Sequence, residues 1–88
     1  MQQRQLTIVN RLGLHARAGV KLVSLSSKYV SNIFIVANGR RANGRQLMAI
    51  LLLAASLGSP ISIETDGPDE VEAMNAVTRL ISNGFGEG

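Results

Sequence analysis

The chain has a single histidine, His15, in the segment 13–19, and Arg17 lies two residues beyond it. The residues that follow are spaced as in a helix, so His15 falls where a turn leads into the first helical amides. A helix start leaves about four backbone N–H groups without internal partners and carries partial positive charge, so it can hold an anion. A neutral imidazole there could take a phosphoryl group, whose oxygens would meet these amides and the Arg17 guanidinium.

Few other catalytic chemistries suit this composition. The absence of cysteine excludes a disulfide, a thiolate zinc site and thiol catalysis, and one histidine excludes a histidine-rich metal site. A Ser–His–Asp triad needs a carboxylate to orient the imidazole, but every Asp and Glu follows residue 63. The segment 39–45 lacks the Gly-Lys-Ser/Thr ending of a phosphate-binding loop. Histidine as a covalent nucleophile remains.

The net charge of +3 hides an uneven distribution. Residues 1–63 carry eight Lys or Arg and no acid, whereas residues 64–88 carry six acids and one base. This asymmetry indicates an acidic partner or anionic ligand near the N-terminal part, unless the two parts neutralise each other locally in the fold. Nucleic-acid binding is disfavoured, because base stacking needs aromatic residues and only three are scattered along the chain.

The length and hydropathy predict one domain, residues 1–88, with an aliphatic core. The longest apolar run, residues 47–55, is about half of what a membrane span needs. The first residues lack the apolar segment of a signal peptide. We therefore expect a cytoplasmic protein without membrane insertion.

Hydrophobic periodicity predicts strands at 5–9, 32–37, 40–43 and 61–65, with helices at 16–27 and 47–55 and a third that opens at Pro68 and stops at Gly84. The order β-α-β-β-α-β-α predicts an α+β fold, an open-faced β-sandwich in which three helices cover one face of a four-stranded antiparallel sheet. The tail 85–88 is expected to fray unless Phe85 fixes it.

Two helices are predicted to present an apolar surface for a partner protein. In the first helix, the apolar residue Val20 falls on the polar arc. In the second helix, one apolar side stays exposed if Ile50 and Leu53 on the other side pack on the sheet. The alternative is that the second helix is buried on both sides. We call the candidate partner-binding set the docking face; it comprises Leu12, Val20, Lys21, Ser24, Leu47, Met48 and Leu51.

The segment Gly13-Leu14-His15-Ala16-Arg17 resembles the phosphorylation site of the histidine-containing phosphocarrier (HPr, or HPr/NPr) family of the phosphoenolpyruvate-dependent phosphotransferase system. Asn38-Gly39 and Asn43 with Gln46-Leu47-Met48 resemble the family's second segment, and the similarity extends over nearly the whole chain. It implies that His15 accepts a phosphoryl group on Nδ1 from enzyme I and passes it to a IIA protein or domain. Arg17 would assist, and Ala16 and Arg17 would bind the phosphate. The resemblance implies a monomeric carrier rather than a stand-alone catalyst, without cofactor or metal.

Two positions differ from the family pattern. Ala18 stands where many members have proline, and Gln46 stands where members regulated by an HPr kinase carry serine, so phosphorylation at that position is not expected. The ending 81–85 is similar to the nitrogen-related branch rather than the sugar-transport branch. A non-phosphorylated regulatory module on the same fold is the alternative, and the pairing of His15 with Arg17 argues against it.

Overall fold

The computed structural model describes residues 1–87. The predicted order of strands and helices is confirmed. The elements are β1 (Gln2–Thr7), α1 (Ala16–Ser26), β2 (Asn32–Ala37), β3 (Arg40–Asn43), α2 (Leu47–Leu51), β4 (Pro60–Asp66), α3 (Glu70–Ser82) and a short 3-10 helix, η1 (Gly84–Gly86). Within residues 1–87, no helix has both the length and the apolar character to cross a membrane.

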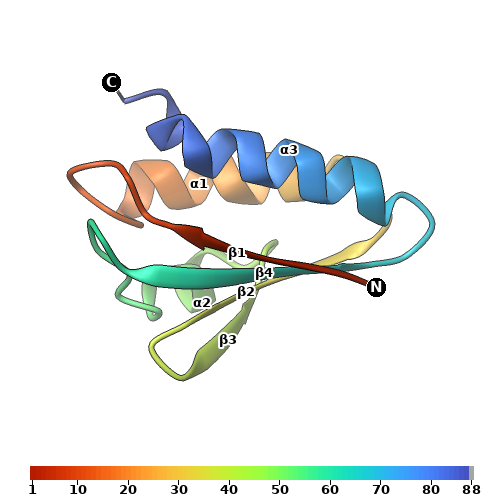
Figure 1. The fold of residues 1–88 in the computed structure, drawn as a ribbon, viewed down its shortest axis with the longest axis horizontal. Coiled ribbons are helices and arrows are strands. Elements are labelled where there is room, and N and C mark those ends of the chain that lie inside the picture. Colours follow the sequence, from red (N-terminus) through yellow and green to blue (C-terminus); the bar gives the residue numbers. More distant parts are fainter. Residues whose placement is uncertain (88) are drawn as a thin grey trace.

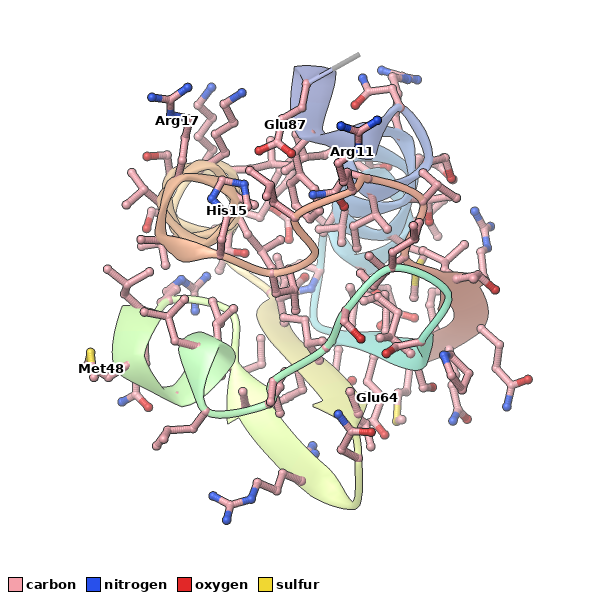
Figure 2. The ribbon with its side chains drawn as sticks, turned by 90° about the vertical axis from the view of Figure 1, so that its left-hand side faces the viewer. Arg11, His15, Arg17, Met48, Glu64 and Glu87 are labelled. Carbon is pink, nitrogen blue, oxygen red and sulfur yellow. The ribbon has the colours of Figure 1, made fainter. Side chains whose placement is uncertain are left out.

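The four strands form one antiparallel sheet in the order β1-β4-β2-β3. Figure 1 shows α1 and α3 lying side by side over the sheet, and Figure 2, viewed from one end, shows α2 on the same side. The predicted open-faced sandwich is therefore confirmed. The Asn38-Gly39 turn joins β2 to β3, and both residues have positive φ, as a two-residue hairpin requires.

The core lies between the sheet and the helices. Alternate residues of β2 and β4 face inward, which buries Ile33, Ile35, Ile61 and Ile63 completely or nearly so. The helices cover them with aliphatic side chains at helical spacing, as the sequence predicts. The fully buried helix residues include Ala18, Leu22, Ile50, Met74, Val77 and Ile81.

The second helix is shorter than predicted, because it ends at Leu51 instead of residue 55. The side-chain amide of Asn38 donates to the Leu53 carbonyl (2.8 Å), and Ala54 has φ 53, so the chain leaves the helix there. Ile50 and Leu53 are buried as expected, but Leu47 and Leu51 are only half exposed. A Cβ at Gly19 would lie 2.7 Å from a Leu47 methyl, so α2 packs directly against the backbone of α1.

The first strand also differs, since it spans Gln2–Thr7 and not 5–9. Thr7 pairs with Pro60, where β4 begins. Beyond that point Ile8 bonds to the loop before β4: its N–H donates to the Ser59 carbonyl (3.0 Å), and its own carbonyl accepts from Gly58 (2.9 Å). Ile8 is therefore buried without belonging to the sheet.

The third helix begins at Glu70 with Asp69 as its N-cap, so Pro68 precedes the helix and is not its first residue. The Asp69 carboxylate is directed away from its own helix. It accepts hydrogen bonds from the Ser31 hydroxyl and from the amides of Ser31 (2.9 Å) and Val30 (3.0 Å). These bonds fasten the loop between α1 and β2 to the start of α3. They lower the pKa of Asp69, and the Ser31 hydroxyl contributes most.

This network predicts an acid-dependent loss of stability. Because the pKa of Asp69 is lower in the folded than in the unfolded chain, its contribution is present above the ordinary value of 3.8 and is lost as the pH falls through the folded-state value. Asp69→Asn should lower the unfolding midpoint at neutral pH and flatten its decline in acid. Denaturation series at several pH values test this, with the exposed Asp66→Asn as control. Equal acid profiles for both variants would refute the assignment.

Candidate functional site

His15 is the N-cap of α1, with φ −79 and ψ 178, and its side chain is 26% exposed. The loop before it is held on two sides. The Leu14 amide donates to the Ala55 carbonyl (2.9 Å), and the Asn10 side-chain amide donates to the Gly13 carbonyl (2.8 Å). Gly13 has φ 65, and a Cβ there would lie 2.5 Å from the Ala55 carbonyl oxygen. Only glycine fits this position, so Gly13 determines how the chain enters α1.

The start of α1 is open to an anion. The first intrahelical bond runs from the Gly19 amide to the His15 carbonyl (2.8 Å). The amides of Ala16, Arg17 and Ala18 have no acceptor among residues 1–87, the His15 side chain does not cap the helix, and no acid lies in the first turn. These amides therefore offer the unpaired donors and partial positive charge that the sequence predicts.

The C-terminal tail packs beside this helix start instead of fraying, because Phe85 fixes it, which was the stated alternative. Phe85 is buried and has φ 58, and it lies between two glycines that also have positive φ. The Lys21 ammonium donates to the Phe85 carbonyl (2.6 Å). Figure 1 shows the tail above the N-terminal end of α1. Residue 88, the last of the segment expected to fray, lies outside the described residues.

This path brings Glu87 to His15. One oxygen of the Glu87 carboxylate contacts His15 Nε2, and the other accepts a hydrogen bond from the Asn10 side-chain amide (2.9 Å). The Asn10 bond, followed by the bond to His15, lowers the pKa of Glu87 below its ordinary value. Glu87 is therefore ionised at neutral pH. Nδ1 of His15 has no hydrogen-bond partner among residues 1–87.

Cations and apolar side chains surround the pair in an open depression. In Figure 2, Arg17 and Arg11 lie on opposite sides of His15 and Glu87. Both arginines line the depression, and neither side chain has a hydrogen bond or ion pair among the residues described. The exposed apolar residues of its wall are Val9, Leu12 and Leu57.

Some residues of the docking face are exposed and others are not. Leu12, Val20 and Met48 are at least half exposed, and Ser24 is exposed on α1. Lys21 is exposed but its ammonium is engaged with the tail, and Leu47 and Leu51 are half-buried against Gly19. Figure 2 shows Met48 projecting from α2. Leu52 is also exposed, and sequence reasoning missed it because the predicted helix continued past it.

Sequence reasoning also missed Glu87 and Asn10. The signal for Glu87 was weak: an aromatic residue between glycines near the end of the chain indicates an anchored turn, but not what the turn carries. Asn10 follows directly after the predicted strand 5–9, and nothing in the sequence around it indicates a role in the site. Across residues 1–87 no group of three or more His, Cys, Asp or Glu could hold a metal ion.

Known proteins are similar to this chain in sequence and in structure over its whole length. A family model described as "PTS HPr component phosphorylation site" matches residues 2–83. The phosphocarrier protein HPr of Cupriavidus necator is 51% identical over 88 residues, and the alignment covers 100% of this chain and 99% of that protein. HPr of Neisseria meningitidis is 46% identical with the same coverage. The crystal structure of HPr from Thermoanaerobacter tengcongensis superimposes with a TM-score of 0.95 at 34% identity, over 100% of this chain and 99% of that one.

The contact of Gly13 with Ala55 predicts a specific sensitivity. Gly39 also has positive φ, but a Cβ there would meet nothing within 4 Å, so Gly39→Ala reports the backbone cost alone, about 1–2 kcal/mol. Gly13→Ala adds a clash with backbone and should lower the free energy of unfolding by a further 1–3 kcal/mol or so. Chemical denaturation of both variants measures the difference. Equal losses would show that the loop yields without strain.

Proposed function

The chain belongs to the HPr family and is a phosphocarrier of the phosphotransferase system, and we propose that His15 is the residue that carries the phosphoryl group. The observation that carries this proposal is the position of a partly exposed imidazole at a helix start with three open amides. No other histidine is present in the sequence. We further propose that phospho-enzyme I is the donor and a IIA protein or domain the acceptor.

Transfer begins with attack by the Nδ1 lone pair on phosphorus. The bond from Nδ1 to phosphorus forms as the bond from phosphorus to the donor's atom breaks, and the electron pair of that bond stays with the donor. The phosphoryl oxygens then meet the amides of Ala16 and Arg17 and the Arg17 guanidinium. Charge-assisted hydrogen bonds of this kind stabilise the dianion. Because they are few and open to solvent, the group can leave again.

The same surface is proposed to serve donor and acceptor in turn. The phosphoryl group must face a partner closely, and the docking face borders His15 through α1 and continues onto α2. Its exposed apolar residues provide contact area, while Arg11 and Arg17 favour partners with acidic surfaces. We also propose that the chain acts as a monomer in the cytoplasm, where it can exchange between partners that use the same surface.

The alternative, a regulatory module that binds partners without phosphorylation, would use the docking face alone. It gives no reason for an imidazole to lie beside helical amides and a guanidinium that have no partner in the described part of the chain. The geometry therefore supports a phosphocarrier that uses His15 over a regulatory module that does not.

Incubation with enzyme I, phosphoenolpyruvate and magnesium tests the proposal. We expect intact mass to increase by one acid-labile phosphoryl group, and no increase for His15→Ala, whose circular dichroism should match the wild type. An acid-stable adduct on serine, or an unchanged adduct in His15→Ala, would contradict the assignment.

Arg17→Ala should slow transfer while the fold stays intact, because Arg17 is exposed and free of intramolecular hydrogen bonds within residues 1–87. Loss of one charge-assisted hydrogen bond, about 1.5–3 kcal/mol, predicts a decrease in kcat/KM of roughly tenfold to a hundredfold. Rapid-quench transfer from phospho-enzyme I measures this. Arg79→Ala, an exposed arginine on α3, is the control. Equal rates for both variants would remove Arg17 from the site.

A further inference from the structure

Glu87 lies outside residues 2–83, which the family model matches, yet its carboxylate contacts the imidazole of His15. We propose that Glu87 is a positioning residue that keeps a proton on Nε2 of His15 throughout the transfer cycle. This inference rests on the proposed role of His15 as phosphoryl acceptor. The contact acts on both states of the ring, the free imidazole and the phosphorylated one.

In the free imidazole, the contact with Glu87 determines which ring nitrogen carries the proton. An ionised carboxylate can only accept hydrogen bonds, so the ring nitrogen that faces it must carry hydrogen. A neutral imidazole has one such proton, and placing it on Nε2 leaves the lone pair on Nδ1. Asn10 supports the ionised state, because its NH₂ group donates both to Glu87 and to the Gly13 carbonyl. The contact therefore selects the nitrogen that attacks.

In the phosphorylated ring, the contact with Glu87 favours the form that keeps the Nε2 proton. After attack by Nδ1, the ring holds phosphorus on one nitrogen and the same proton on Nε2, so it is cationic. When the bond from phosphorus to Nδ1 breaks, its electron pair returns to Nδ1 and the phosphoryl group joins the acceptor. The leaving group is then a neutral imidazole, whereas without the Nε2 proton it would be an imidazolate anion. A carboxylate at Nε2 stabilises the cationic form and so keeps the phosphoryl group transferable.

The tail is built to hold this carboxylate in place. Phe85 anchors it in the core, Lys21 binds the Phe85 carbonyl, and the Asn83 side chain accepts from the Gly86 amide (3.1 Å). Glu87 itself is only 18% exposed. The other charged groups that line the depression are Arg11, Arg17 and Lys21, all cations. Glu87 is thus the carboxylate available to His15 there.

The test compares Glu87→Gln, Glu87→Ala and the wild type, with the exposed Glu72→Gln on α3 as control. Each protein is labelled with ¹⁵N in the imidazole and phosphorylated by enzyme I and phosphoenolpyruvate. Nitrogen and phosphorus NMR then report which ring nitrogen holds phosphorus and the pH at which the phosphorylated ring loses its Nε2 proton. Rapid-quench transfer to a IIA protein gives the rate.

We expect phosphorus on Nδ1 in the wild type. In both Glu87 variants the midpoint for loss of the Nε2 proton should fall by about one pH unit, which corresponds to about a tenfold loss of the protonated form. Transfer to the acceptor above this midpoint should slow by about the same factor, and Glu72→Gln should leave both unchanged. Equal midpoints in all four proteins, or phosphorus on Nε2, would overturn the role of Glu87. Failure of the wild type to form any phosphohistidine would instead refute the function proposed for His15, so the two failures are distinguishable.

Discussion

The three amides at the start of α1, which have no acceptor within residues 1–87, are the constraint on which the site depends. A helix usually satisfies these donors with a capping side chain or an acid in its first turn, and α1 has neither. Its stability comes from elsewhere: Ala18 and Leu22 are fully buried, and Gly19 allows α2 to pack closely. The bonds from Asn10 and Leu14 fix the entering loop. The fold thus stabilises the helix through its buried side and leaves its positive end free for a ligand.

The fold and the position of His15 at a helix start followed from local patterns. Hydrophobic residues alternate in 32–37 and 61–65, and they have helical spacing after His15. Both patterns depend only on residues close in sequence, and the burial of these residues in the structure agrees with them. Boundaries of β1, α2 and α3 did not follow. At α2 and α3 distant partners set them: Asn38 binds the Leu53 carbonyl, and Ser31 draws Asp69 away from its own helix. The contact between His15 and Glu87 joins residues 72 positions apart, and no periodicity indicates it.

The uneven charge along the sequence is partly neutralised in the structure. Several acids of the C-terminal part are used internally: Glu64 pairs with Arg41 (3.1 Å), Asp69 binds the loop before β2, and Glu87 contacts His15. Arg11 and Arg17 have no such partner within residues 1–87. The alternative of local neutralisation therefore holds for part of the fold, and the acidic partner or anionic ligand stays a prediction. Local neutralisation operates across the sheet, and unbalanced positive charge remains around the imidazole.

The packing of α2 on the bare backbone at Gly19 has a geometric consequence for recognition. Because Gly19 has no side chain, Leu47 and Leu51 of α2 pack directly on the backbone of α1, and Met48 projects from α2. In the proposed docking mode, a partner bound to α2 would present its phosphoryl group at the start of α1. The missing side chain of Gly19 would therefore set the distance between the part of the proposed docking face on α2 and the phosphoryl site.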